Sequence, residues 1–217
     1  MVVIPKDHAA WLEERKKGIG ASEASSILGM NKWKNNVELW EEKVGLREAE
    51  DISDKPQVKY GHDAEPHIRA LFALDHPELE LTYESPYKII RNDDHPFIFA
   101  TPDGELQEKD TGRSGGLEVK TTEIQNAKQW KEWDERIPDN YFAQVCHQML
   151  ATGWQFVWLV AQIKWTDRNG NKRKDTREYL IERYEVEEDI EVLKDETIKF
   201  WHLIETKKRP PLKLPSI

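Results

Sequence analysis

The longest apolar run of the chain, Phe156 to Ile163, constrains the fold more than any other stretch. It is too short to cross a bilayer, for which a helix needs about 20 residues. A strand that is apolar on both faces is typical of the interior of a sheet covered by helices. We therefore expect this run to be a central strand of a helix-flanked sheet.

The segments around this run alternate between strand-like and helix-like patterns. The strand-like runs are 79–84, 87–91, 97–100, 117–121 and 178–184, and the helix-like runs are 6–17, 23–28, 36–44, 58–72, 125–133, 141–151 and 187–205. This order predicts one α/β domain over residues 1–209, with a central mixed sheet of about five strands flanked by helices. Residues 210–217, which contain Pro210, Pro211 and Pro215, are expected to form a flexible tail.

Two of the strand-like runs, 97–100 and 117–121, are separated by the polar interval 105–116. Gly, Ser, Thr and charged residues fill this interval, so it is interpreted as a hairpin connection. If the two runs pair, Asp103 at the end of the first lies beside Glu118 on the second.

The motifs Thr101-Pro-Asp-Gly104 and Leu117-Glu-Val-Lys120 would then bring ionisable groups to one edge of a sheet. Side-chain alternation places Glu118 and Lys120 on the same face of their strand. Asp103 and Glu118 would repel each other unless a cation lay between them, and their hard oxygen ligands suit Mg²⁺ or Mn²⁺. The alternative is a solvated hairpin whose charges have no function.

Composition limits the functional classes. A net charge of −9 argues against non-specific DNA binding through the whole surface, although a local field matters more than the total. Lys and Arg concentrate at 15–17, 168–174 and 207–209, each either an ordinary solvated patch or a DNA contact. The single cysteine, Cys146, excludes an internal disulfide and a Cys-rich metal site. Without a signal-peptide pattern or a membrane span, a cytoplasmic protein is expected.

The turn Gly18-Ile-Gly-Ala-Ser22 leads into a helix that is expected to start at Glu23, with Ser22 as its N-cap. A helix N-terminus with a neighbouring arginine, here Arg15, is a candidate anion site. The alternative is a tight connection between two helices, and Glu23 disfavours a phosphate unless its side chain turns away.

Several stretches, in this order, resemble the YqaJ-like viral recombinase family, which includes the lambda-type exonuclease and lies in the PD-(D/E)xK nuclease superfamily. They are Trp11…Arg15-x-x-Gly-Ile-Gly-Ala-Ser-Glu23 with Leu39-Trp-Glu-Glu-Lys-Val-Gly45, Gly61-His-Asp-Ala-Glu65, the two motifs that contain Asp103 and Glu118, and Tyr141-Phe-Ala-Gln-Val145. Each stretch alone is a weak signal, but the ordered set is specific.

The resemblance implies a restriction-endonuclease-like core and a metal-dependent 5′→3′ exonuclease acting on linear double-stranded DNA. Such an enzyme leaves 3′ single strands for a single-strand annealing protein. The implied cofactor is Mg²⁺, with Mn²⁺ as a substitute, and the implied assembly is a trimer. The implied setting is a phage or prophage gene expressed in the cytoplasm of a bacterial host.

By the same resemblance, the metal ligands would be Asp103, Glu118, the Val119 carbonyl and Glu65, the last as an acidic partner on a neighbouring helix. Lys120 would position or deprotonate the attacking water. Glu65 could equally be an ordinary exposed carboxylate on its helix.

Further residues match by motif. Arg15 and Ser22 match the family's pocket for a terminal 5′ phosphate, and Gln144 matches a residue that lines the active site. His62 and His147 depart from the expected pattern and are assigned no role.

Two other functions remain open. One is a PD-(D/E)xK endonuclease or repair nuclease, which would cut a closed circle that an exonuclease leaves intact. The other is a non-catalytic phage DNA-binding, scaffold or accessory protein, in which the acidic cluster is structural.

Overall fold

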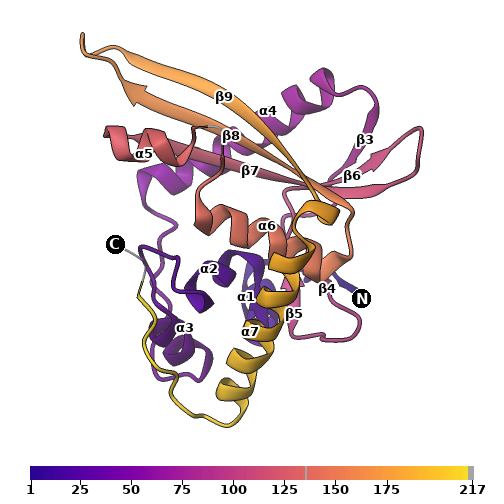
Figure 1. Cartoon of the computed structure of the whole chain (residues 1–217), viewed down its shortest axis with the longest axis vertical. Helices are drawn as coiled ribbons and strands as arrows, with labels where there is room; N and C mark the ends of the chain where they lie inside the picture. Colours follow the sequence, from indigo (N-terminus) through magenta and orange to yellow (C-terminus); the bar gives the residue numbers. More distant parts are fainter. Residues whose placement is uncertain (135, 215–217) are drawn as a thin grey trace.

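A five-stranded sheet occupies one end of the computed structural model, which describes residues 1–134 and 136–214 (Figure 1). Its strands run in the order β3-β6-β7-β8-β9. They are β3 (Leu79–Thr82), β6 (Gly104–Glu108), β7 (Ser114–Ile124), β8 (Phe156–Thr166) and β9 (Lys172–Glu182). β7 and β8 are parallel and the other neighbours antiparallel, which confirms the expected mixed sheet. The apolar run 156–163 lies inside the sheet, between β7 and β9.

A second sheet, of four strands, was not predicted. Its order is β1-β4-β5-β2, formed by β1 (Val2–Val3), β4 (Ile89–Arg91), β5 (Ile98–Ala100) and β2 (Ile19–Gly20). Two-residue strands leave no alternating pattern in a sequence, so β1 and β2 could not be recognised. Gly18 is required where β2 approaches β5, because a Cβ at this position would collide with the Phe97 carbonyl oxygen.

The predicted hairpin was wrong in its strand pairing. The run 97–100 forms β5 in the four-stranded sheet, and the antiparallel partner of β7 is β6. β6 lies within the interval that was interpreted as a connection. Its buried positions, Gly104 and Leu106, alternate with more exposed ones, but one of them carries no side chain, so the strand signal was weak.

The helices are α1 (His8–Lys16), α2 (Ala24–Ile27), α3 (Asn36–Lys43), α4 (Pro56–Asp75), α5 (Ala127–Glu132), α6 (Asp139–Thr152) and α7 (Glu187–Glu205), with 3₁₀ turns η1 (Ala21–Glu23) and η2 (Arg183–Glu185). α4 covers one face of the five-stranded sheet and α6 the other, whereas α1, α2 and α3 lie away from this sheet, toward the other end of the molecule (Figure 1). α4 packs through Ile68 and Phe72 against Leu117 and Val119 of β7. α6 contributes to a larger core on the other face. This layering confirms the α/β class.

The expectation that Ser22 caps the helix after the turn was wrong. Residues 21–23 form the 3₁₀ turn η1, and Ser22 lies inside it. The Glu23 carboxylate closes the turn by accepting the Gly20 N–H at 2.8 Å. The Ser22 hydroxyl is left to accept a hydrogen bond from Arg15 instead.

The C-terminal segment was expected to be flexible, but residues 210–214 are held against α3 and α7. Asn36, almost fully buried, donates to the Pro211 carbonyl (2.8 Å) and accepts the Lys213 N–H (2.9 Å). The Lys213 ammonium lies 2.6 Å from Glu196. A proline-rich pattern does not reveal partners so distant in sequence. Residues 215–217 lie outside the described part of the chain.

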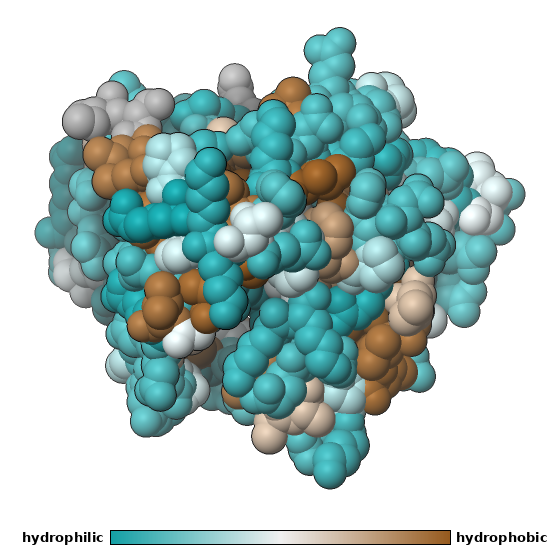
Figure 2. All heavy atoms as spheres, turned by 90° about the horizontal axis from the view of Figure 1, so that it is seen from below, coloured by the Kyte–Doolittle hydropathy of each residue, from teal (hydrophilic) through white to brown (hydrophobic). Residues whose placement is uncertain are grey.

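The end of the molecule that carries α3 and α7 has a mostly hydrophilic surface on which apolar residues form separate patches (Figure 2). This dispersion fits a chain in which 34% of the residues are charged. Across residues 1–134 and 136–214, no helix combines the length and the apolar character that a membrane span requires.

Candidate active site

The site is built where the β6–β7 ladder ends. The last pair of this ladder is Gly104 opposite Leu117, and Asp103 precedes it. The Val119 N–H donates to Asp103 Oδ2 at 2.8 Å, so the carboxylate takes the place of a strand partner. The N–H and C=O of one strand residue point to the same side, so the Val119 carbonyl also faces this edge.

Glu118 points to the opposite face of β7 from Val119 and is only 2% exposed. It is satisfied by three donors: Gln144 Nε2 at 2.6 Å from Oε1, Gln148 Nε2 on Oε2, and the Lys120 ammonium on Oε1. Gln144 and Gln148 are one turn apart on α6, so both amides reach the same carboxylate. A buried carboxylate needs such partners, because leaving it unpaired is costly.

Glu65 on α4 is held at this edge by Arg69. The Arg69 guanidinium donates to Glu65 Oε1 at 3.0 Å and also to the Asp103 carbonyl oxygen. It lies over the Tyr83 ring, 3.5 Å from the centroid. Arg69 therefore ties α4 to the segment that carries Asp103. Arg69 was not predicted as a site residue, although its i+4 spacing from Glu65 was a usable signal.

A cavity of about 310 Å³ opens at this edge. Its lining contains every residue that was predicted to bind the metal or to act in catalysis, which we call the acidic centre, together with Gln144. The lining residues are Gln57, Val58, Gly61, His62, Glu65, Thr101, Asp103, Glu118, Val119, Lys120, Thr121 and Gln144.

The electrostatics of the cavity are those of crowded negative charge. Burial, and then repulsion by Glu118 and Glu65, raises the pKa of Asp103 well above its ordinary value. Burial acts to lower the pKa of Lys120, but attraction to Glu118 and Asp103 outweighs it, so that pKa is raised. Without a further cation, Lys120 is the positive charge that the carboxylates share.

The donor set fits a hard divalent cation. Asp103, Glu118 and the Val119 carbonyl carry oxygen atoms at one edge, and the raised pKa of Asp103 marks a charge conflict that a hard cation would relieve. In the described ranges, no three His, Cys, Asp or Glu side chains are grouped closely enough to hold a metal by themselves. Main-chain oxygen is therefore needed in the set, and Glu65 remains engaged with Arg69.

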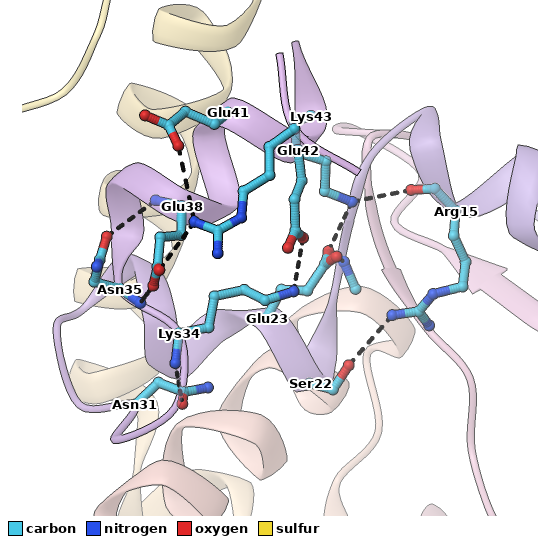
Figure 3. Close-up of polar contacts among 12 residues, drawn as sticks. Arg15, Ser22, Glu23, Asn31, Lys34, Asn35, Glu38, Glu41, Glu42 and Lys43 are labelled. Atoms are coloured by element: carbon cyan, nitrogen blue, oxygen red, sulfur yellow. Dashed lines mark hydrogen bonds and ion pairs between the residues drawn. The ribbon is translucent and has the colours of Figure 1, made fainter. Parts of the chain in front are cut away.

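Arg15 and Ser22 come together at a second position, outside the cavity lining (Figure 3). Arg15 Nη2 donates to Ser22 Oγ at 3.3 Å, and the guanidinium lies over the Trp11 ring at 4.8 Å. The turn that carries Ser22 packs against α6, the helix whose amides hold Glu118. α6 thus connects the two positions.

Glu23 turns away from Ser22 and toward Lys43 (Figure 3). Lys43 Nζ lies 2.9 Å from Glu23 Oε2 and donates to the carbonyls of Gly18 (2.7 Å) and Arg15 (3.1 Å). Burial would raise the pKa of Glu23, but Lys43 and then Arg15 lower it. Glu23 is therefore ionised, and its negative charge is balanced by Lys43. The objection that Glu23 would repel an anion is weakened. Lys43 was missed, because nothing in its helix pattern indicates burial.

The two unassigned histidines differ in position. His62 lines the cavity. His147 is fully buried on α6, and its Nε2 lies 3.1 Å from the Ile19 carbonyl oxygen. Burial lowers the pKa of His147 to about 4, so it is neutral near pH 7. His147 therefore links α6 to β2 as part of the core.

Comparison with solved structures shows the fold. The alkaline exonuclease LHK-Exo from Laribacter hongkongensis is similar at a TM-score of 0.60 and 20% identity, over 92% of this chain and 95% of that one. A structure of LHK-Exo in complex with dAMP gives a TM-score of 0.59. A phage-related exonuclease from Haemophilus somnus 129PT gives 0.53 at 14% identity, over 88% of this chain and 96% of that one.

Comparison of sequences adds a relative and a family to the likeness in fold. The uncharacterized protein YqaJ of Bacillus subtilis (strain 168) is 35% identical over 146 residues, which is 67% of this chain and 43% of that protein. The matched part thus spans less than half of that relative. A model of the YqaJ-like viral recombinase domain matches residues 10–155, a range that contains the motifs of both positions. The chain therefore belongs to the YqaJ-like viral recombinase domain family.

Proposed function

We propose that the protein is a Mg²⁺-dependent 5′→3′ exonuclease that degrades one strand of linear double-stranded DNA. The observation that carries this proposal is the grouping of Asp103, Glu118 and Lys120 at an open strand edge beside a cavity. The family and the fold of two exonucleases support it. One of these was solved with dAMP, a nucleoside monophosphate of the kind that exonucleases release.

The chemistry that a divalent cation supplies in such a site is to polarise a phosphoryl oxygen and to acidify water. Asp103, Glu118 and the Val119 carbonyl would hold it. Gln144 and Gln148 fix the orientation of Glu118, and Arg69 fixes the backbone of Asp103. Lys120, which contacts Glu118 and lines the cavity, would accept or hold a proton there.

We expect the protein to digest linear duplex DNA only with Mg²⁺ or Mn²⁺ present and to leave a covalently closed circle intact. The measurements are release of acid-soluble nucleotide from the linear duplex and conversion of the closed circle to nicked or linear forms on a gel, with EDTA as the metal-free control. Cutting of the circle would favour the endonuclease alternative. Neither release nor cutting would favour a non-catalytic DNA-binding or accessory protein.

The 5′→3′ polarity of digestion would be set by Arg15 and Ser22, which would bind the terminal 5′ phosphate. A terminal phosphate carries more charge than an internal diester, and charge-assisted hydrogen bonds strengthen with charge. We expect Arg15→Ala to slow digestion of 5′-phosphorylated ends about 10- to 100-fold, corresponding to a bond of about 1.5–3 kcal/mol to a charged group. Digestion of 5′-hydroxyl ends should change little, and Lys16→Ala, also on α1, is the matched control. Equal slowing on both ends would show that Arg15 is structural.

The wider setting follows from the same proposal. The 3′ single strands would be used in recombination by an annealing protein, in the cytoplasm of a bacterial host that carries the phage or prophage gene. A homotrimer is the expected assembly, and sedimentation equilibrium measures it.

A further inference from the structure

The hairpin formed by β8 and β9 extends beyond the other strands of its sheet (Figure 1). Near its tip, Lys164 pairs with Lys174, and Thr166 pairs with Lys172. Residues directly opposite each other in a sheet share a face, and so do residues two apart on one strand. Lys164, Lys172 and Lys174 therefore project from one face, which we call the lysine face.

The lysine face continues from the cavity. Thr121, which lines the cavity, pairs with Gln162, and Glu123 pairs with Lys164. These pairs lie on the same face of the sheet as the lysines. The lysine face therefore begins two residues farther along β7 than the cavity wall, a distance of about 7 Å.

The positive charge on this face is only partly neutralised. The Glu123 carboxylate forms an ion pair with the Lys172 ammonium at 3.0 Å, and the Lys172 side chain is still 77% exposed. The Lys164 ammonium lies over the Tyr60 ring, 3.2 Å from its centroid. In the part of the chain that the structure describes, neither Lys164 nor Lys174 has a carboxylate within ion-pair distance.

The pKa of Lys164 reflects this excess of positive charge. Burial lowers its pKa; Glu123 opposes that shift, but Lys172 adds to it. A bound anion would relieve the repulsion between Lys164 and Lys172. In a chain of net charge −9, such a local excess of positive charge is not a consequence of overall composition.

We propose that the lysine face binds the phosphate backbone of the DNA duplex whose end occupies the cavity. The proposal rests on the proposed function for the substrate, and on charge and continuity for the contact. Lysine ammonium groups on flexible stems contact phosphates without reading sequence. This face would therefore add affinity to any linear duplex, independent of base sequence.

The test is a triple variant, Lys164→Gln, Lys172→Gln and Lys174→Gln, compared with Lys6→Gln, Lys109→Gln and Lys199→Gln. Both variants lose three positive charges, and the control residues are exposed and lie outside every basic cluster of the sequence. Binding of a blunt, fluorescent duplex of roughly 20 base pairs is measured by anisotropy in EDTA, which prevents hydrolysis. Removing about three phosphate contacts should lower affinity at least about 10-fold near 0.1 M salt. The slope of log affinity against log salt should fall by about 2–3.

Equal effects of the two triple variants, or no change in the salt slope, would overturn the proposal. The thermal midpoint of each variant shows that a weakened variant is still folded. Digestion of linear DNA is measured separately with Mg²⁺. If the lysine-face variant binds DNA more weakly but the wild type digests no DNA, the lysine face is supported and the exonuclease is rejected. If the variant binds DNA as well as the wild type and the wild type digests DNA, the exonuclease is supported and the lysine face is rejected.

Discussion

Replacing Asp103 by Asn is expected to lower the rate of DNA hydrolysis by at least about 10³-fold and to leave the fold intact. Asn keeps an oxygen that can accept the Val119 N–H, which lies 2.8 Å from Asp103 Oδ2. It removes the negative charge that makes this group a ligand for a hard cation. Single-turnover digestion of a linear duplex with saturating protein measures the loss.

The same substitution should raise the thermal midpoint of the metal-free protein. Burial and repulsion by Glu118 and Glu65 raise the pKa of Asp103 in the folded state. A raised carboxyl pKa means that stability falls as pH rises from the unfolded to the folded pKa, and the full cost applies above both. Asn carries no charge, so it avoids this cost at neutral pH.

Thermal denaturation with and without Mg²⁺ therefore separates a ligand from a structural residue. Wild type should gain stability on adding Mg²⁺, and Asp103→Asn should gain much less. Asp110→Asn, in the exposed turn between β6 and β7, is the matched control and should resemble wild type in activity and midpoint. A midpoint of Asp103→Asn well below wild type would show that Asp103 is mainly structural, and near-normal digestion would remove it from the site.

The acidic centre was predictable to the extent that it depends on local geometry. The shared face of Glu118 and Lys120 follows from strand alternation, and the two side chains are in contact. The position of Asp103 beside Glu118 was right for a partly wrong reason, because the pairing strand is β6 rather than 97–100. Asp103 still precedes the ladder, so the error in pairing left its place unchanged.

The supporting contacts were not predictable in the same way. Gln148 reaches Glu118 from a helix 30 residues away in sequence, and Arg69 reaches the Asp103 carbonyl from another. Lys43 and Asn36 are polar residues whose burial depends on carbonyls and a tail that only tertiary packing brings near. A pattern within one element reports which face is buried, but not which distant group satisfies a polar side chain.

Lys120→Arg is expected to lower the single-turnover rate about 10²–10⁴-fold, the range typical of a lost general base. Arg keeps the positive charge beside Glu118 but stays protonated at all working pH values. The adjoining cavity of about 310 Å³ leaves room for the larger side chain. The substitution therefore separates proton transfer from the simple presence of a cation.

The pH profile supplies the second measurement. Glu118 and Asp103 raise the pKa of Lys120, so in wild type the neutral, proton-accepting fraction increases with pH. The rate should rise up to tenfold per pH unit below that pKa, and Lys120→Arg should lose this rise. Lys109→Arg, in the turn after β6, is the control and should keep both rate and profile. Near-normal turnover of Lys120→Arg would exclude proton transfer by Lys120, because Arg keeps the charge and the hydrogen-bond donors but cannot accept a proton.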